Sequence, residues 1–380
     1  MILNNVRIAL TGEEVNISIQ DGKIAQILPG HFHDKTERLD LHFNNAVIFP
    51  GLINSHDHLD FNLFPALGDS IYNNYTEWGL HIHKNYKDKI NSVLKVPEIL
   101  REHWGIYKNL LCGVTTVINH GKKIRSRTKM LSVYENCQCI HSVQFEKGWR
   151  FALNNPFRKR TSVVVHSGEG TDYPSFEEIG KLTRWNLLKR PLIAVHGVAM
   201  TENQVNAFAA LVWCPESNYF LLDQTAPVNR LKKHIPILFG TDSTLTGDWN
   251  IWQHIRLARK TKFMTDKELY DTLTINAAKA WKLNSGEIAA GKDADLVIAK
   301  VKNYAADAFF AINPHDLLMV IHKGEISLFD EELYSQLKGS DFDDYSRVYI
   351  DGACKFVKGN LPQLMQKIKE YYPESNFPVM

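Results

Sequence analysis

Two histidines that lie one residue apart follow an apolar segment near the N-terminus and could bind a metal ion. The apolar run Ala46–Phe49 and a Pro-Gly break precede the segment Asn54–His58. Residues two apart on a β-strand share a face, so His56 and His58 would point the same way and Asp57 the other way. Two converging imidazoles supply half of the ligands of a tetrahedral metal site.

The same spacing occurs twice more in the chain. His31 and His33 lie in a polar stretch, and His81 and His83 lie in a stretch rich in Lys and Asn. Only the pair at positions 56 and 58 ends an apolar, strand-like run. We therefore interpret the other two pairs as solvated or packed histidines rather than ligands.

Three further side chains that can bind a metal occupy the equivalent position in other segments. His166 and His196 come directly after apolar, strand-like runs, and Asp242 follows the run that ends at Phe239 after Gly240 and Thr241. In a barrel of alternating strands and helices, catalytic side chains lie where the strands end at one face. Agreement across four strand ends favours one shared metal site over several unrelated structural residues.

The elements that would position these residues alternate along the chain. Near-continuous apolar runs are typical of parallel strands that are covered on both faces, and they alternate here with amphipathic helical segments. This alternation indicates either a (β/α)8 barrel or a doubly wound sheet. The strand candidates are Gly113–Asn119, Thr161–Val165, Leu192–Val195, Leu211–Trp213 and Ile235–Phe239.

Local signals at helix starts and at the two chain ends complete this outline. Asp21-Gly22 between alternating runs predicts a hairpin, and a similar β texture returns at Gly291–Ala299 and Val320–Ile326. Residues Leu361–Tyr371 predict an amphipathic helix that docks on the body of the protein or at a subunit contact. Capping boxes predict helix starts at Ser175 with Glu178, Thr201 with Gln204 and Thr265 with Glu268.

The composition is that of a folded globular protein. The chain has 380 residues, of which 44% are hydrophobic and 23% charged, with a formal net charge of +2, which excludes global disorder. Five scattered cysteines do not suggest a disulfide scaffold. No secretory signal pattern precedes the first strand, and no apolar run reaches the ~18 residues of a membrane helix. We expect a soluble, cytoplasmic protein that makes no membrane contact.

Two basic clusters raise the alternative of nucleic-acid binding. Lys122–Lys129 and Arg158–Arg160 could contact phosphates. Neither cluster has interleaved aromatic residues or a recognisable binding motif, so a solvated surface is the better interpretation. We expect no nucleic-acid partner.

The strand-end residues resemble the metal-dependent amidohydrolase superfamily, whose barrel carries His-x-His on strand 1, His on strands 5 and 6, and Asp on strand 8. Within it, His166-Ser167-Gly168-Glu169 is similar to the His-x-x-Glu of the mononuclear branch that holds cytosine and guanine deaminases and triazine hydrolases. The resemblance covers nearly the whole chain, including Pro50–Asn54, Trp213–Asn218, Thr274–Ala280, Ser285–Ile288 and Gly291–Leu296.

The resemblance implies an α/β fold with a (β/α)8 TIM barrel at residues 50–282. Residues 1–49 and 283–380 would form a small β-sandwich module built from both chain ends, with the C-terminal helix attached. Relatives are commonly oligomeric, which leaves a homo-oligomer open, and no feature of the sequence fixes the number of subunits.

The resemblance also implies one divalent metal ion, with zinc favoured and iron or manganese as alternatives. Such an ion lowers the pKa of bound water towards ~7 and supplies hydroxide at neutral pH. Glu169 would take the proton of the water and pass it to the leaving group. Asp242 would serve as ligand and base, and His196 either as ligand or as polariser of the substrate. The implied metal ligands are His56, His58, His166, His196 and Asp242.

Several site residues carry weaker interpretations. His120, Trp213, Ser217 and Asn218 are candidate substrate-pocket residues, although a structural role is open for each. His141 and His254 are interpreted as structural. The tight spacing between Gln144, His166 and His196 predicts short loops and a more open pocket.

The function predicted is a metal-dependent hydrolase that acts on non-peptide C–N bonds and deaminates a small nitrogen heterocycle. Cyclic amide or lactam opening, as in imidazolonepropionase-like relatives, is the alternative enzyme activity. A two-metal amidohydrolase with Lys147 as bridging ligand is less favoured, because a Lys at a strand end usually faces solvent. A barrel retained only for binding is disfavoured because all the proposed catalytic residues are present.

Overall fold

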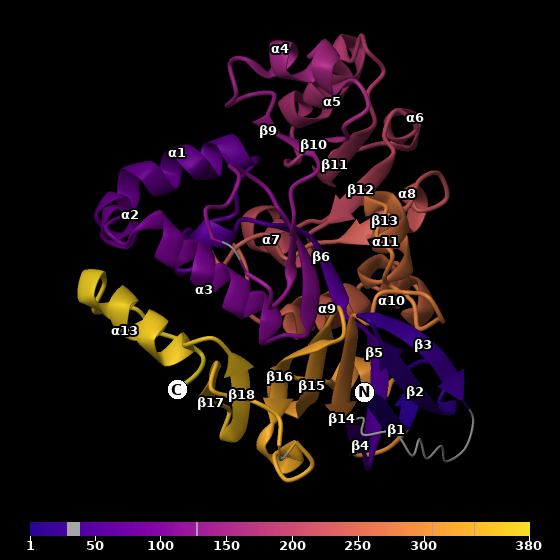
Figure 1. Cartoon of the computed structure of the whole chain (residues 1–380). Coiled ribbons are helices and arrows are strands. Elements are labelled where there is room, and N and C mark those ends of the chain that lie inside the picture. The colour runs from indigo at the N-terminus through magenta and orange to yellow at the C-terminus, as the bar shows by residue number, and fades with distance from the viewer. Residues whose placement is uncertain (29–38, 127, 306, 338) are drawn as a thin grey trace.

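The computed structural model describes residues 1–28, 39–126, 128–305, 307–337 and 339–380. Among these residues, the strands that carry the predicted site form a three-stranded and a five-stranded parallel sheet (Figure 1). The first contains β6 (Leu52–Asp57), β7 (Val114–Asn119) and β8 (Ser132–Tyr134). The second contains β9 (Gln138–Ser142), β10 (Val163–Ser167), β11 (Leu192–His196), β12 (Ala210–Trp213) and β13 (Ile237–Phe239).

These strands form because their residues are apolar or β-branched and are buried on both faces. Every residue of β6, β7, β10, β11, β12 and β13 is buried. Neighbouring strands are consecutive in sequence and parallel, and their carboxyl ends lie level, as the pairing of Ser167 with His196 shows. The residues that follow the strands are therefore brought to one edge.

The two parallel sheets approach each other at β13 and β6. The backbone amides of Thr241 and Asp242 donate to the His56 carbonyl at 3.1 and 3.0 Å. Between the other pair of sheet edges, β8 and β9, no strand pairing is present among the described residues. An α/β fold with parallel strands is thus confirmed, while closure into an eight-stranded barrel stays a prediction.

Helices connect these strands and cover them (Figure 1). Two capping boxes are confirmed: Thr201 with Gln204, and Thr265 with Glu268. The third is wrong, because Asp172 caps the helix that follows β10 and accepts from the Ser175 amide. The helices of this part are α1 (Tyr75–Asn85), α2 (Lys87–Leu94), α3 (Glu98–Leu110), α4 (Trp149–Leu153), α5 (Tyr173–Trp185), α6 (Glu202–Val205), α7 (Pro215–Leu222), α8 (Val228–Leu231), α9 (Ile251–Lys260), α10 (Asp266–Leu273) and α11 (Ile275–Trp281).

The two chain ends build one further sheet, as the β texture predicts. Its path among the described residues is β17-β18-β16-β15-β14-β5-β1-β2-β3, with β4 paired to β1. Its seam is the antiparallel pairing of β5 with β14. The strands are β1 (Ile2–Ile8), β2 (Glu14–Gln20), β3 (Lys23–Leu28), β4 (Asp40–His42), β5 (Ala46–Pro50), β14 (Leu296–Lys300), β15 (Leu317–His322), β16 (Glu325–Asp330), β17 (Tyr345–Ile350) and β18 (Ala353–Lys358).

Side chains from both chain ends share one apolar cluster on this sheet. Ile17 and Ile48 from the N-terminal strands lie in the same cluster as Ile298 and Met319 from the C-terminal strands. The hydrogen bonds define one continuous sheet, so a two-sheet sandwich and the boundaries at residues 49/50 and 282/283 stay predictions. The predicted C-terminal helix is confirmed as α13 (Leu361–Tyr371), which packs against α3.

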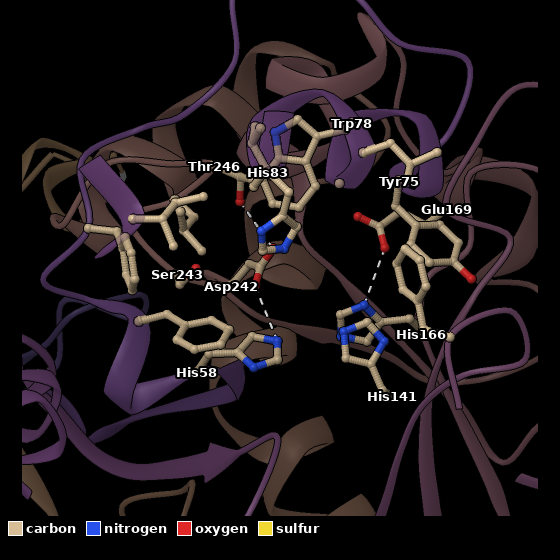
Figure 2. Close-up of a pocket in the computed structure, with 18 of the residues that line it drawn as sticks. His58, Tyr75, Trp78, His83, His141, His166, Glu169, Asp242, Ser243 and Thr246 are labelled. Carbon is tan, nitrogen blue, oxygen red and sulfur yellow. Dashed lines mark hydrogen bonds and ion pairs between the residues drawn. The ribbon is translucent and has the colours of Figure 1, made fainter. Parts of the chain in front are cut away.

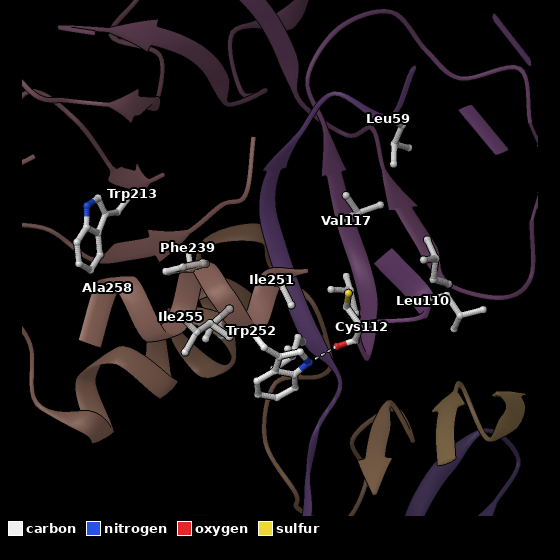
Figure 3. Packing of buried hydrophobic residues seen from close by; sticks show 14 of the residues in the cluster. Leu59, Leu110, Cys112, Val117, Trp213, Phe239, Ile251, Trp252, Ile255 and Ala258 are labelled. Atoms are coloured by element: carbon white, nitrogen blue, oxygen red, sulfur yellow. Dashed lines mark hydrogen bonds between the residues drawn. The ribbon is translucent and has the colours of Figure 1, made fainter. Parts of the chain in front are cut away.

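The largest apolar cluster joins this sheet to the parallel strands (Figure 3). Trp252 of α9 packs edge-on against Phe49 of β5, with ring centroids 5.8 Å apart. Its indole nitrogen donates to the Cys112 carbonyl at 3.2 Å, which satisfies the one polar atom of a buried tryptophan. Trp252 therefore joins β5 to the segment that precedes β7.

The remaining sequence features fall outside the site. The basic side chains of Arg158, Lys159 and Arg160 are exposed, as are Lys122 and Lys123. Position 127 of the cluster Lys122–Lys129 lies outside the described residues, as do His31 and His33 of the first alternative His-x-His pair. In the described part of the chain, no helix has the length and apolar character needed to cross a membrane.

Candidate active site

The predicted ligands from four strand ends converge at the shared edge of the parallel sheets, and Figure 2 shows three of them, His58, His166 and Asp242. His56 Nε2 and His58 Nε2 each lie 3.6 Å from Asp242 Oδ1. The ring of His166 lies 4.9 Å from that of His56 and 4.8 Å from that of His196, measured between centroids. Residues far apart in sequence therefore meet because each follows a strand that ends at the same level.

Several nitrogens in this cluster are buried without a hydrogen-bond partner. They are both ring nitrogens of His56 and the Nε2 atoms of His166 and His196. Burial lowers the pKa of His56 and of His196 to about 4, and also lowers the pKa of His166. Neutral imidazoles are the form that ligates a metal. Unpartnered neutral nitrogens that face one carboxylate fit a divalent cation.

Asp242 is oriented with one oxygen toward the histidines. Its Oδ2 atom accepts hydrogen bonds from Ser217 Oγ at 2.8 Å and from Thr246 Oγ1 at 3.1 Å. Burial by itself raises the pKa of Asp242, but the imidazoles of His56, His58 and His196 close to its carboxylate hold that pKa well below its usual range. The carboxylate therefore remains ionised.

Two of the converging residues have a left-handed backbone. His196 has a φ of +71° and Asp242 a φ of +58°. Side-chain-bearing residues adopt this region at a cost of roughly 1–3 kcal/mol, and such strain concentrates at functional sites. The backbone turns immediately after these strands and directs both side chains to the same point.

Glu169 lies beside the histidines and lines the cavity. Its Oε2 atom is 3.2 Å from His166 Nδ1 and 3.5 Å from His196 Nε2. Burial, together with the carboxylates of Asp242 and Glu178, raises the pKa of Glu169 well above its usual value. A carboxyl group that retains its proton near neutral pH can act as a general acid.

The turn that carries Glu169 is held by a second buried carboxyl group. Glu178 of α5 accepts from the Gly168 amide at 2.8 Å and from the Tyr75 hydroxyl at 3.4 Å. Gly168 has a φ of +66°, and a Cβ there would lie 2.8 Å from Ile179 Cδ1. The left-handed backbone at this position favours glycine.

His196 is fixed by a chain of hydrogen bonds behind the site. Trp213 Nε1, which can only donate, contacts Thr225 Oγ1 at 2.7 Å, and Thr225 in turn lies 3.3 Å from Asn218 Oδ1. The Asn218 amide nitrogen then faces His196 Nδ1 at 2.9 Å. Since Nδ1 accepts this hydrogen bond, the ring proton of neutral His196 is on Nε2, the atom that points at Glu169.

The supporting position predicted for Asp57 is visible in its contacts. It accepts hydrogen bonds from Lys108 Nζ at 3.1 Å, from Asn109 Nδ2 at 2.8 Å and from Asn62 Nδ2 at 2.7 Å. Asp57 is fully buried and points away from the histidine cluster. These contacts compensate its charge and fix the strand end that presents His56.

None of the four side chains predicted for the substrate pocket is among the residues that line this cavity, so their contact with substrate stays a prediction. Trp213 is wholly buried in the apolar core (Figure 3). Ser217 and Asn218 lie behind the ligands and orient Asp242 and His196, as described above. His120 is buried beside the cluster, with its ring 4.7 Å from that of His166.

His120 is nevertheless a candidate ligand. Burial lowers its pKa to about 4, and neither of its ring nitrogens has a hydrogen-bond partner. His120 belongs to one of three groups of side chains whose possible ligand atoms all lie within 4.8 Å of one another. The groups are His56, His120 and His166; His56, His196 and Asp242; and His166, Glu169 and His196.

Sequence reasoning missed two other histidines of the cavity. His141 lies near the end of β9, with its ring 5.1 Å from that of His166, and it lines the cavity, so its interpretation as structural is corrected. Its strand-end position was the available signal, but the polar strand Gln138–Ser142 is hard to recognise. His83 lies on α1 at the cavity rather than on a strand.

Two other interpretations can be placed. His254 is buried, and its Nε2 lies 2.8 Å from the Asp248 carbonyl, as suits a structural residue. Lys147 is exposed on the turn after β9 and does not line the cavity, which disfavours it as a bridging metal ligand.

The cavity has a volume of about 470 Å³ and extends from the histidine cluster to α1 and α2 (Figure 2). His58, His166, Glu169 and Asp242 form its inner end. This volume lies within the ~300–1,000 Å³ range of pockets that bind small organic molecules.

Comparisons with known proteins agree with this geometry. Residues 159–327 match the model of the Amidohydrolase family. The chain is 24% identical over 335 residues to a 5'-deoxyadenosine deaminase of Methanococcus maripaludis, covering 71% of this chain and 78% of the relative. It is 23% identical over 379 residues to an imidazolonepropionase of Thermoplasma volcanium, covering 84% and 91%.

A solved structure shows the same fold. The zinc complex of atrazine chlorohydrolase from Arthrobacter aurescens superimposes with a TM-score of 0.69 at 15% identity, covering 98% of this chain and 100% of that one. The predicted resemblance to the amidohydrolase superfamily is confirmed, and the chain is a hydrolase. At the level of class, the prediction of a metal-dependent hydrolase of C–N bonds is confirmed as well.

Proposed function

We propose that the protein removes the amino group of a nitrogen heterocycle as ammonia, with one divalent metal ion in the site. The observation that carries this proposal is the convergence of unpartnered imidazoles on the Asp242 carboxylate, next to the buried carboxyl group of Glu169, whose pKa burial raises. The relative that deaminates 5'-deoxyadenosine supports an aminated ring as the substrate.

The donor set suits zinc, with iron or manganese as alternatives. His56, His58, His166 and Asp242 would hold the ion, with His166 using the Nε2 atom that its Nδ1 contact to Glu169 leaves available. When bound, the ion would acidify water and so supply hydroxide near neutral pH. His120 is the further donor within reach.

Two carboxyl groups would divide the proton transfers. Replacing an amino group by oxygen consumes one water, whose two protons end on the ring nitrogen and on ammonia. Glu169 holds a proton and is placed to donate it to the ring nitrogen, whereas ionised Asp242 is placed to accept a proton from water. This division of the proton transfers requires Glu169 to be protonated while Asp242 is ionised.

His196 would act as a hydrogen-bond donor to the substrate rather than as a metal ligand. Its Nδ1 atom is engaged by Asn218, so its Nε2 proton points into the site. A buried donor of this kind stabilises negative charge that develops on the ring during attack. This role is the second of the two that the sequence leaves open for His196.

The finer structural and cellular predictions belong to the same proposal. We infer a closed (β/α)8 barrel at residues 50–282 with the β module of both chain ends beside it, which the amide contacts of Thr241 and Asp242 to β6 support. A cytoplasmic location and a homo-oligomer stay predictions.

The test is ammonia release by the zinc-loaded protein from 5'-deoxyadenosine, cytosine and guanine. Glu169→Gln keeps the shape and size of the side chain but removes its proton transfer, so kcat falls by about 10²–10⁴-fold. Zinc content measured in the same samples must be unchanged. Full turnover by the zinc-loaded Glu169→Gln protein would show that the proton transfer is assigned wrongly.

Cyclic amide opening is the second candidate, because the relative from Thermoplasma volcanium is an imidazolonepropionase. That reaction also adds water to a ring carbon but yields a carboxylic acid without ammonia. Measuring acid and ammonia on the same substrates therefore separates the two activities.

A further inference from the structure

The outer half of the cavity differs sharply in chemistry from its inner end. The walls that extend away from the histidines come from η1 (Leu59–Phe61), α1 and α2, and from the turn after β9. They present the side chains of Phe61, Trp78, Ile82, Leu94 and Phe145. These aromatic and aliphatic groups form a continuous apolar surface that faces the reacting end.

The polar atoms of three side chains near this surface are already engaged within the protein. Trp78 Nε1 donates to the Leu67 carbonyl at 2.6 Å, so the indole presents only its apolar ring to the cavity. The Tyr75 hydroxyl donates to Glu178, and the Thr246 hydroxyl donates to Asp242. A ligand group that lies along Trp78 and its apolar neighbours thus meets carbon surface, and the polar side chains left on the walls outside the inner end are His83, His141 and Ser243.

Charge in the cavity also discriminates between substrates. No described residue that lines the cavity is a Lys or Arg. Its acidic groups, Glu169 and Asp242, lie at the inner end. An anionic substituent that entered would lose its hydration without gaining an ion pair to a Lys or Arg, and the basic side chains outside the inner end are the imidazoles of His83 and His141. A neutral apolar substituent would instead cover apolar wall that water otherwise contacts.

The rim of the cavity leaves room for a substituent of some length. Leu80 is 73% exposed, Phe145 49% and Leu94 48%, although all three line the cavity. Large apolar side chains that remain this accessible in a concave site are typical of ligand-binding surfaces. A bare ring at the inner end would leave them uncovered.

We propose that the substrate is an amino-substituted heterocycle that carries a neutral, apolar side chain, and that rings with a carboxylate or phosphate on this side chain are excluded. The ring lies against Glu169 and the histidines, and the alkyl, alkylthio or aryl substituent lies along α1 and α2. This inference rests on the proposed function, because it places the aminated ring at the metal end.

The experiment measures binding to the zinc-loaded protein by titration calorimetry. The two probes are 9-butyladenine and 9-(3-carboxypropyl)adenine, which share the ring and the length of the chain but differ in charge. We expect the butyl compound to bind at least about tenfold more tightly, with a negative heat-capacity change that reports apolar burial. A butyl compound that binds no more tightly than the carboxylate overturns the inference.

A pair of substitutions tests the location. Leu94→Arg places a cation at the rim, at the exposed end of α2, and is expected to reduce the preference for the butyl compound at least about tenfold by pairing with the carboxylate. Leu187→Arg is the matched control, because Leu187 is 67% exposed but does not line the cavity. An equal effect of both substitutions, or no effect of Leu94→Arg in a protein with unchanged unfolding temperature, contradicts the proposed location.

Failure of this inference can be distinguished from failure of the proposed function. Binding preference needs no turnover, whereas ammonia release tests the deamination itself. Preferred binding of the butyl compound without ammonia release from any aminated ring leaves the inference standing and refutes deamination. Ammonia release with a preference for the carboxylate refutes only the substrate class.

Discussion

Replacing Thr225 by valine would test the hydrogen-bond chain that sets the tautomer of His196. Valine has the shape of threonine without its hydroxyl group, so Trp213 Nε1 loses its acceptor at 2.7 Å and Asn218 Oδ1 loses its donor at 3.3 Å. Asn218 is then free to turn its oxygen toward His196, which would move the ring proton from Nε2 to Nδ1. Thr225→Ser keeps the hydroxyl and serves as the matched control.

The size of the effect follows from the contacts that are lost. The net contribution of one such hydrogen bond is about 0.5–1.5 kcal/mol, which corresponds to a roughly two- to tenfold loss of kcat in Thr225→Val. Leaving the buried Trp213 N–H unpaired lowers the free energy of unfolding by about 1–3 kcal/mol. Asn218→Asp forces the proton onto Nδ1 and removes the Nε2 donor completely, so kcat falls by about 10²–10³-fold.

The assay combines kinetics with nitrogen NMR of histidine-labelled, zinc-loaded protein. The wild type and Thr225→Ser should show the His196 proton on Nε2, and Asn218→Asp should show it on Nδ1. Zinc content distinguishes a role of His196 as hydrogen-bond donor from a role as metal ligand. If His196 is only a donor, moving its proton from Nε2 to Nδ1 leaves the zinc content unchanged. Equal kcat for Thr225→Val and Thr225→Ser, or an Nδ1 proton in the wild type, would refute the reasoning.

Three further outcomes are expected. Burial raises the pKa of Glu178 to about 7. The native state therefore holds a proton that the unfolded state releases near the ordinary pKa of Glu, so the free energy of unfolding falls as pH rises from about 4.5 to 7. In denaturant titrations at pH 8, the free energy of unfolding of Glu178→Gln should exceed that of the wild type by up to about 3 kcal/mol. Equal pH dependence in both proteins would contradict this. Gly168→Ala should lower the free energy of unfolding by at least about 1 kcal/mol, because Gly168 has a positive φ and an added Cβ would contact Ile179. The control Gly180→Ala lies in open space on α5 and should be neutral or stabilising. Similar losses of stability in both variants would show that the turn tolerates a side chain. Zinc at 1,000 times its Kd adds about 4 kcal/mol to the free energy of unfolding of the wild type and so raises its unfolding temperature. His56→Ala should abolish most of this rise in unfolding temperature. A full rise in the variant would show that the metal binds elsewhere.

Much of the site was accessible from sequence because its residues follow directly from local pattern. His56, His166, His196 and Asp242 each end an apolar run, and the structure brings them together since parallel strands end at one level. Helix starts at Thr201 and Thr265 were predicted because a capping box is made within four residues. Such signals require no knowledge of distant neighbours.

The errors have a common physical origin. Glu178 matches a capping box three residues after Ser175, but its carboxyl group instead holds the Gly168 amide across the turn after β10. His141 was interpreted as structural because its short polar strand does not look buried, yet that strand pairs with β10 and points the imidazole toward His166. Both outcomes depend on neighbours that are remote in the chain.

The sequence by itself determined the class of chemistry: the residue types, their strand-end positions and the resemblance they support. The tertiary structure decided which nitrogen of His196 carries the proton, which carboxyl group of the Glu169 and Asp242 pair is ionised, and that the wall opposite them is apolar. The physical reason is that tautomers, pKa values and cavity surfaces are set by burial and by contacts between elements, and these exist only once the strands and helices have packed together.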